Sequence, residues 1–542
     1  MTKYLFLVLI VFTFYSCGEG NQSDNPNVFR YNESRGIVSL DPAFTRDQTM
    51  IWPALQLYNG LVQMDKELDV KPAIAEEWEI SDDGRVYIFH LRNDVFFHDH
   101  EIFPGGKGVK VTAYDFEYSF KRILDPKIAS PGFWIFNKLD KSQHAGFKAI
   151  NDSTFSIWLT EAFPPFLGML TMPYCSVIPQ EISNHPELDI SREPIGTGPF
   201  RFKLWRRDEK LILLKNENYF ETDVDGNKLP YLDGISISFI KDKQSEFLEF
   251  LLGNIDFLSG LHAVYKDELT TRTGNLNPEY EGKFILDSEP YLNTEYLGFL
   301  ADTSNKDLLG SPIHNVNFRK AVNFGFDRSK MLKYLRNNMG TPAVHGFLPG
   351  GLPFHDLESI KGFDYYPDSV WYYLEKAGYS KGEDIPEITL TTTSDYLDLC
   401  EFIQYELSGF GVKIILDVAT GGAYRNKMAN GHLLFFRGSW IADYPDPENY
   451  LSLFYSENKS PAGPNYTRFQ DPFYDSLYLE ALKTVDSAER KNLYNLMDQY
   501  LVNEAVIVPL FYDKVVRFFP VTVKNFESNP LNLLILKYVT KE

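Results

Sequence analysis

The sequence predicts a mixed α/β protein built from several folding units. Its 542 residues would fill three or four domains of about 150 residues each. Apolar residues make up 44% of the chain and aromatic residues 15%, a composition that can bury large cores. The first half shows alternating apolar and polar residues around turns, whereas residues 388–438 alternate between strand-like and helical segments. We therefore expect antiparallel hairpins first and a parallel sheet later.

The clearest hairpin of the first half spans residues 78–91. Apolar and polar residues alternate on both sides of the turn Asp82-Asp83-Gly84, as they do in two paired strands. A helix is expected over 112–124, because a capping-box-like Thr-Ala-Tyr-Asp precedes apolar residues at helical spacing and Asp125-Pro126 follows. Further strands are expected at 153–159, 199–206, 209–215 and 234–240.

The second half predicts parallel strands joined by right-handed crossovers. In order, we expect a strand at 388–393, a helix at 395–408, a strand at 412–418, a short helix at 421–430 and a strand at 432–438. Ligands of such sheets usually bind in a crevice beyond the carboxyl ends of the strands. The segment after the third strand, residues 439–447, reads Ser-Trp-Ile-Ala-Asp-Tyr-Pro-Asp-Pro and is expected at that crevice.

Residues 1–16 are expected to be a signal peptide. Lys3 precedes an apolar run from Tyr4 to Tyr15, which is too short to span a bilayer core of about 30 Å. Ser16-Cys17 then resembles a bacterial lipoprotein signal, whose cleavage leaves Cys17 as the lipidated first residue. Residues 17–28 would form a flexible tether. The alternatives are a secretory signal that is cut elsewhere and a buried core segment, and in both of them Cys17 is an ordinary thiol.

Charge and cysteine content exclude other classes of protein. Lys and Arg total 53 against 74 Asp and Glu, so the net charge is −21 and no nucleic-acid partner is expected. Cys175 and Cys400 are the only cysteines besides Cys17, which rules out a disulfide-dependent scaffold but leaves open whether these two are paired. No second apolar stretch approaches about eighteen residues, so a lipid on Cys17 would be the only membrane anchor.

Asp443 is the candidate for binding a ligand cation. It follows a predicted buried strand and lies among Trp440, Ala442 and Tyr444, a setting that suits a carboxylate meeting an α-ammonium group in a partly dry cleft. Arg437 carries a guanidinium suited to a ligand carboxylate. Six extended residues span about 20 Å, so the chain must turn back after Trp440 if both residues are to hold one short peptide. The alternatives are a turn-capping Asp443 and a structural Arg437.

Motifs for catalysis and metal binding are missing. His98-Asp99-His100-Glu101 has the residue types of a metal site, but it reads more simply as a polar hairpin connection. Gly196-Thr197-Gly198 lacks the third glycine of a dinucleotide fingerprint, and no acid pair or nucleophile motif is recognisable. We expect no catalytic residue, no metal site, no cofactor and no enzymatic activity.

Several separated stretches resemble the extracytoplasmic solute-binding proteins of peptide ABC transporters, the oligopeptide- and dipeptide-binding family known as solute-binding protein family 5. In the order of that family, they are Val38–Ala43, the hairpin 78–91 with Val95–Asp99, Val111–Phe116, Ile195–Phe200, Asn317–Val322 with Asp327-Arg328, and Trp440–Pro447. They extend over about residues 29–520.

The resemblance implies a two-lobed α/β fold of the periplasmic-binding-protein type II-like kind (cluster C), with a hinge and an extra subdomain in the large lobe. The large lobe would comprise residues 29–285 and the C-terminal return 513–542, with 55–190 as the inserted subdomain. The second lobe would comprise residues 286–512.

The resemblance also implies a function. In oligopeptide binders of this family, the Asp of the Trp-x-x-Asp-Tyr motif pairs with the ligand α-ammonium, which falls on Asp443. In some members an Arg three residues before that Trp takes the ligand carboxylate, which falls on Arg437. The expectation is a monomeric, lipid-anchored protein in the cell envelope of a Gram-negative-type bacterium, facing the periplasm. It would bind short peptides between closing lobes and deliver them to an ABC permease. The alternatives are an oligosaccharide or metal-chelate binder of the same fold and, as a lesser one, a lipid-anchored hydrolase.

Overall fold

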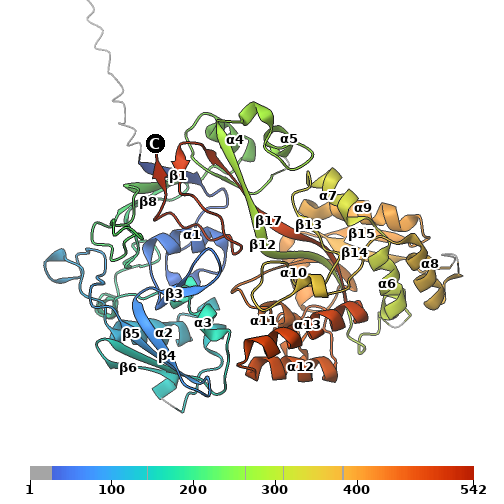
Figure 1. The fold of residues 1–542 in the computed structure, drawn as a ribbon, viewed down its shortest axis with the longest axis horizontal. Coiled ribbons are helices and arrows are strands. Elements are labelled where there is room, and N and C mark those ends of the chain that lie inside the picture. The colour runs from blue at the N-terminus through green and yellow to red at the C-terminus, as the bar shows by residue number, and fades with distance from the viewer. Residues whose placement is uncertain (1–26, 143, 263, 309, 381–383) are drawn as a thin grey trace, which may run out of the picture.

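The computed structural model describes residues 27–142, 144–262, 264–308, 310–380 and 384–542, which form two lobes side by side (Figure 1). The predicted signal peptide, Cys17 and nearly all of the predicted tether lie outside the described residues. Within the described ranges, no helix combines the length and the apolar character needed to cross a membrane.

A four-stranded sheet with the order β1-β10-β9-β8 organises the large lobe. Strands β1 and β10 are parallel, whereas the other neighbours are antiparallel. Phe29 and Ile235 from this sheet share a core with Leu534 and Leu536 near the C-terminus, so the end of the chain returns to this lobe. The elements of this part are β1 (Val28–Asn32), α1 (Gln48–Leu57), β8 (Phe200–Arg206), β9 (Lys210–Lys215), β10 (Gly234–Ser238), α4 (Lys243–Leu251), α5 (Lys266–Leu269), β18 (Val523–Lys524) and β19 (Thr540–Lys541).

A second four-stranded sheet, with the order β4-β5-β7-β6, carries the predicted hairpin and helix. The Thr112 capping box starts α2 as expected, and the Phe116 and Phe120 rings of this helix pack against Phe155 of β7. The elements are β2 (Val62–Met64), β3 (Val70–Pro72), β4 (Ala75–Ile80), β5 (Val86–Leu91), α2 (Ala113–Leu124), β6 (Phe147–Asn151), β7 (Thr154–Trp158) and α3 (Phe166–Met169).

The second lobe is built on a seven-stranded sheet with the path β11-β17-β12-β16-β14-β15 and with β13 beside β17. Strand β14 is parallel to both β15 and β16, which confirms the predicted β-α-β-α-β unit. The strands are β11 (Leu258–Ser259), β12 (Phe284–Phe299), β13 (Thr341–Pro342), β14 (Ile388–Thr392), β15 (Ile414–Val418), β16 (Phe435–Ile441) and β17 (Ile507–Pro520). The helices are α6 (Val316–Phe324), α7 (Arg328–Leu335), α8 (Pro367–Lys376), α9 (Leu397–Ser408), α10 (Gly421–Ala429), α11 (Glu448–Leu451), α12 (Pro472–Lys483) and α13 (Ser487–Glu504).

Strand β16 differs from the prediction. It was expected to end near Gly438, but it continues to Ile441, because Asn293–Phe299 of β12 lie antiparallel to Phe435–Ile441 and pair with all of it. Trp440 therefore belongs to a strand and not to the turn that follows it. The pairing partner is remote in the sequence, so local residue patterns carry no trace of it.

The long strands β12 and β17 cross from one lobe to the other (Figure 1). Val508 at the start of β17 packs in the core of the second lobe, whereas Phe519 near its end packs in the core of the large lobe. The two ends of β12 likewise pack in different cores: Leu297 lies in the core of the second lobe, and Leu286 packs against a separate cluster around Phe250 and Phe518. The predicted lobe boundaries at 285/286 and 512/513 fall inside these strands, and their exact positions stay predictions.

Cys175 and Cys400 are separate, buried thiols, which answers the question that the sequence left open. Cys175 follows α3 in the subdomain of the large lobe, and Cys400 lies on α9 of the second lobe. Burial raises the pKa of both thiols, so neither is activated as a nucleophile.

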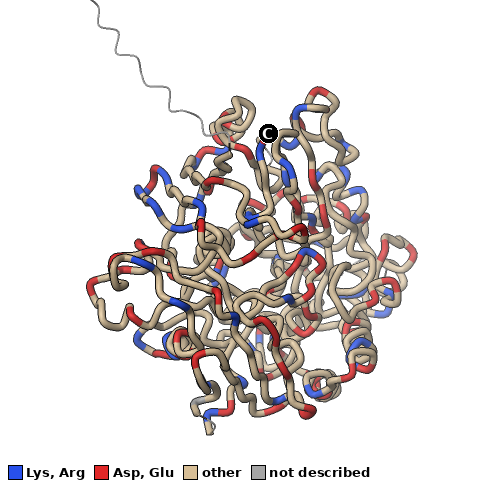
Figure 2. Tube along the Cα trace, turned by 60° about the vertical axis from the view of Figure 1, so that its left-hand side comes forward, with Lys and Arg blue, Asp and Glu red and all other residues tan. Residues whose placement is uncertain are grey.

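Acidic and basic residues are interspersed along the trace of both lobes (Figure 2).

Arg517 of β17 fastens the C-terminal segment to the strands that join the lobes. It is fully buried, and its guanidinium donates to the Asn532 side chain at 2.9 Å and to the Leu533 carbonyl at 3.0 Å. It also lies over the Phe526 ring at 5.3 Å. Burial lowers the pKa of Arg517 to about 10, so the side chain stays charged at neutral pH.

We expect Arg517→Ala to reduce the free energy of unfolding by about 3 kcal/mol or more, because buried acceptors lose their donor and a cavity is left. Urea unfolding followed by fluorescence measures this loss. Arg207→Ala is the matched control, because Arg207 is exposed, and it should change stability by less than about 0.5 kcal/mol. Equal effects of the two substitutions would contradict the structural role of Arg517.

Candidate ligand-binding site

A cavity of about 340 Å³ lies between the lobes and has Asp443 on its wall. The large lobe contributes the loop 45–48 that starts α1 and, from its subdomain, Trp134 and Tyr174. The hinge strand β12 contributes Tyr291, and Ile441–Asp443 come from the second lobe. Because both lobes form the walls, a change in their separation opens or closes this space.

Asp443 projects into the cavity just beyond the end of β16. Its side chain is exposed to the hollow space, yet the surrounding protein is dense enough for desolvation to raise the pKa of Asp443 to about 6. The Asp443 backbone N–H donates to Asn449 Oδ1 at 3.3 Å, and the indole N–H of Trp440 donates to the same oxygen at 2.9 Å. Asn449 also hydrogen-bonds the Asp443 carboxylate and partly offsets the rise in pKa. Asn449 therefore fixes the position of the acid.

Asp443 is the acid of its motif that stays available to a ligand. Asp446 is buried and accepts the Glu448 backbone N–H at 2.9 Å. Glu448 is also buried and accepts hydrogen bonds from the hydroxyls of Tyr444 and Tyr478. Among the described residues, no Lys or Arg forms an ion pair with Asp443. The site thus presents a desolvated carboxylate that no described Lys or Arg engages in an ion pair, which is an arrangement that attracts a cation.

The other predicted residues of the motif hold this arrangement in place. Ala442 lines the cavity beside Asp443, and its N–H donates to the Leu292 carbonyl at 2.9 Å. Tyr444 is buried, and its ring lies 6.2 Å from that of Trp134 across the interface between the lobes. Trp440 orients Asn449, as described above. Ala442 and Asp443 therefore face the cavity, whereas Trp440 and Tyr444 act from behind its wall.

Arg437 lies in a different environment. It is largely but not fully buried on β16, forms an ion pair with Glu295 of β12 and lies over the Tyr396 ring at 3.1 Å. It is not among the residues that line the cavity. The strand continues one residue beyond Trp440 to Ile441, and the chain then bends at residues 443–446, so Arg437 lies about 13 Å from the end of the strand. Its role as the partner of the ligand carboxylate stays a prediction.

The Arg437 guanidinium pairs with one acid of a cluster at the hinge, which consists of Glu295 and Asp513. The Asn293 amide donates to Glu295 at 3.1 Å and to Asp513 of β17 at 3.2 Å. Burial, followed by the charge of Glu295, raises the pKa of Asp513 to about 6. A cation is needed here because two carboxylates share one desolvated space.

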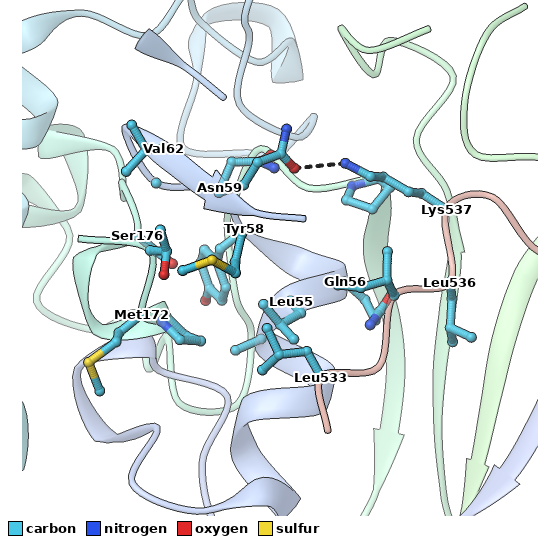
Figure 3. A pocket seen from close by; sticks show the side chains of 18 of the residues that line it. Leu55, Gln56, Tyr58, Asn59, Val62, Met172, Ser176, Leu533, Leu536 and Lys537 are labelled. Carbon is cyan, nitrogen blue, oxygen red and sulfur yellow. Dashed lines mark hydrogen bonds between the residues drawn. The ribbon is translucent and has the colours of Figure 1, made fainter. Parts of the chain in front are cut away.

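A second, smaller cavity of about 70 Å³ adjoins the first inside the large lobe. Leu55, Met172 and Leu533 line both spaces, and Figure 3 shows Tyr58 and Lys537 around the second one. Lys537 forms an ion pair with Glu221 and donates to the Gln63 side chain at 2.8 Å. The space next to Asp443 therefore continues into a pocket whose wall carries Lys537, and Glu221 neutralises the charge of that lysine.

Several residues of the site escaped the sequence analysis, namely Arg46, Trp134, Tyr174, Tyr291 and Asn449. All but Asn449 are remote in sequence from the Asp443 motif, and no local pattern marks them. Asn449 lies close to the motif, but its use depends on the turn from β16 into α11. The cluster at His98 has other partners: His98 Nε2 lies 2.9 Å from the Gly198 carbonyl, and Asp99 pairs with Lys107. Within the described ranges, no group of three side chains could hold a metal ion.

Asp443→Asn should stabilise the ligand-free protein at neutral pH. Because the folded-state pKa is raised, the ionised acid opposes folding; this cost is fully present above about pH 6 and disappears below about pH 4. The gain is modest, because the side chain still contacts cavity water. Calorimetric scans of ligand-free protein should show a higher Tm for the variant at pH 7.5 and a smaller difference at pH 4.5. A difference that does not change with pH would contradict the desolvated acid.

Arg437→Met should reduce the free energy of unfolding by about 3–5 kcal/mol, because it leaves Glu295 buried and unpaired. Adding Glu295→Gln to this variant should restore part of the loss, and urea unfolding of the single and double variants measures both effects. Unchanged stability together with weaker ligand binding would instead support Arg437 as a ligand-binding residue.

Comparisons with known proteins agree with this architecture. The model of the bacterial extracellular solute-binding proteins, family 5 (Middle), matches residues 69–462. Heme-binding protein A of Haemophilus influenzae is 28% identical over 94% of this chain and 91% of its own. Dipeptide-binding protein DppE of Bacillus subtilis is 25% identical over 96% and 93%.

A solved structure with the same fold is the periplasmic binding protein DppA of Helicobacter pylori in complex with the peptide STSA. It has a TM-score of 0.76 and 26% identity, and the match covers 95% of this chain and 98% of that one. The predicted family, the two-lobed fold and the expectation of a binding protein instead of an enzyme are thereby confirmed. The chain belongs to the bacterial extracellular solute-binding proteins, family 5.

Proposed function

We propose that this protein captures short peptides between its lobes, binds their α-ammonium group through Asp443 and delivers them to an ABC transporter permease. The observation that carries the proposal is the desolvated Asp443 carboxylate on the wall of the interlobe cavity, for which no Lys or Arg of the described residues supplies a positive charge through an ion pair. A bound ammonium supplies that charge and forms charge-assisted hydrogen bonds of about 2.7–2.9 Å.

Binding of the peptide main chain would add affinity without demanding a particular sequence. An extended peptide can complete hydrogen bonds as an added strand does, while its side chains occupy adjoining space such as the second cavity. Closure follows if the closed lobes make contacts with the ligand that the open lobes do not. The strands β12 and β17, which run between the lobes, would act as the hinge of such closure.

Relatives of this chain are named for different solutes, including heme, dipeptides and glutathione. The family alone therefore leaves the solute open. An oligosaccharide would use the aromatic residues of the cavity, Trp134 among them, but would leave Asp443 without a cation. A metal chelate with net negative charge would be repelled by it. The unpaired acid thus favours a ligand with an amino group.

The location proposed for the protein rests on its N-terminal sequence and its family. Cleavage before Cys17 and lipidation of its thiol would anchor the folded part to a membrane of the cell envelope, facing the periplasm, as a monomer. The support is the apolar run that ends at Ser16-Cys17 and membership in an extracellular family.

The test is calorimetry on ligand-free protein prepared by unfolding and refolding. Tripeptides should bind with micromolar affinity, and Asp443→Asn should weaken binding at least tenfold, about 1.4 kcal/mol, because the carboxylate charge is lost while the shape is kept. Blocking the peptide amine by acetylation should have a similar effect on the wild type.

Asp225→Asn is the matched control, since Asp225 lies exposed in a turn of the large lobe, and it should leave the affinity unchanged. Tripeptides that bind the Asp443 variant as tightly as the wild type would reject the assigned role.

A further inference from the structure

Arg46 lies on the large-lobe wall of the cavity that contains Asp443. It directly precedes Asp47, the residue that caps α1 by accepting the Thr49 N–H at 3.1 Å, so the helix start fixes the backbone at Arg46. The Arg46 side chain is exposed. In the described part of the chain, its guanidinium makes no ion pair and no hydrogen bond. The Arg46 guanidinium therefore faces the cavity without an acidic partner among the described residues.

The other arginines near the site have acidic partners. Arg437 pairs with Glu295 behind the wall of the cavity. Arg35 lines the cavity but lies 3.8 Å from Glu33. Arg46 is thus the arginine of the cavity wall that lacks an acidic partner within the described ranges. A guanidinium presents parallel N–H donors that match a carboxylate in bidentate geometry.

Asp443 and Arg46 act on the same side chain. Tyr174 lines the same cavity, and its pKa is raised by burial and by the Asp443 charge, whereas the Arg46 charge lowers it. The acid of the second lobe and the arginine of the large lobe thus belong to one electrostatic neighbourhood. Asp47, which also acts on Tyr174, is engaged in capping α1.

We infer that Arg46 binds the α-carboxylate of the ligand, so that the cavity selects zwitterionic peptides short enough for both ends to lie within it, namely di- and tripeptides. This inference rests on the proposed function, because it assigns the opposite end of the same ligand. The cavity measures about 340 Å³, and an extended tripeptide spans about 10 Å. A pentapeptide, at about 17 Å, would have to fold or leave one end outside.

The placement of the two charges also gives closure a cause. Asp443 belongs to the second lobe and Arg46 to the large lobe, so a zwitterion bound at both ends bridges them. A peptide that lacks either charge can form an ionic contact with only one of the two lobes. The closed state then gains a contact that the open state lacks, which is what a ligand must supply to shift the equilibrium between them.

Calorimetry with trialanine, its C-terminal amide, its N-acetyl form and pentaalanine tests this inference. Wild-type protein should bind trialanine at least tenfold more tightly than the amide or pentaalanine. Arg46→Gln should weaken trialanine binding at least tenfold while changing the affinity for the amide less than twofold. Arg207→Gln, on the exposed surface, is the control and should have no effect. Thermal scans verify that each variant is folded.

The outcomes separate this inference from the proposed function. Equal affinity of the wild type for trialanine and its amide, or an equal loss of both in Arg46→Gln, would overturn the role of Arg46. In that case the N-acetyl form still reports whether Asp443 binds the amino end. Failure of the wild type to bind any of these peptides would reject the peptide function together with the role of Arg46.

Discussion

Asp443 has lost much of its hydration on the wall of the cavity between the lobes, and no cation of the described chain forms an ion pair with it. An isolated buried charge is costly, so proteins usually pair such groups or neutralise them. Here the neighbouring acids Asp446 and Glu448 are satisfied by internal hydrogen bonds, whereas Asp443 is held ready by Asn449. The free energy that the ligand-free protein gives up at this position becomes binding energy when a ligand supplies the missing positive charge.

The fold provides this arrangement through strand pairing. Because β12 pairs with β16 as far as Ile441, the chain leaves the sheet just before Asp443 and places the acid beyond the end of β16. The same β12 runs with β17 between the lobes, so the strand that positions the acid also belongs to the hinge. Arg437 neutralises the buried Glu295 beside these strands. A change at this charge cluster would therefore affect stability and closure before it affected contact with a ligand.

Much of the fold was predictable from local patterns. The hairpin at 78–91, the helix that starts at Thr112 and the parallel unit at 388–438 carry strong periodicity and capping signals, and the structure contains each of them. Asp443 could be singled out because its motif is compact in the sequence. The far end of β16, the partner of Arg437 and the approach of Arg46 and Trp134 to the cavity could not be predicted, because each depends on contacts between residues far apart in the chain.

The most direct measurement is a crystal structure of the protein with a bound short peptide. It should show the peptide nitrogen about 2.7–2.9 Å from a carboxylate oxygen of Asp443, with Trp134 and Tyr174 enclosing it from the opposite lobe. A ligand seated elsewhere, or one that leaves Asp443 facing only water while the lobes are closed, would contradict the account.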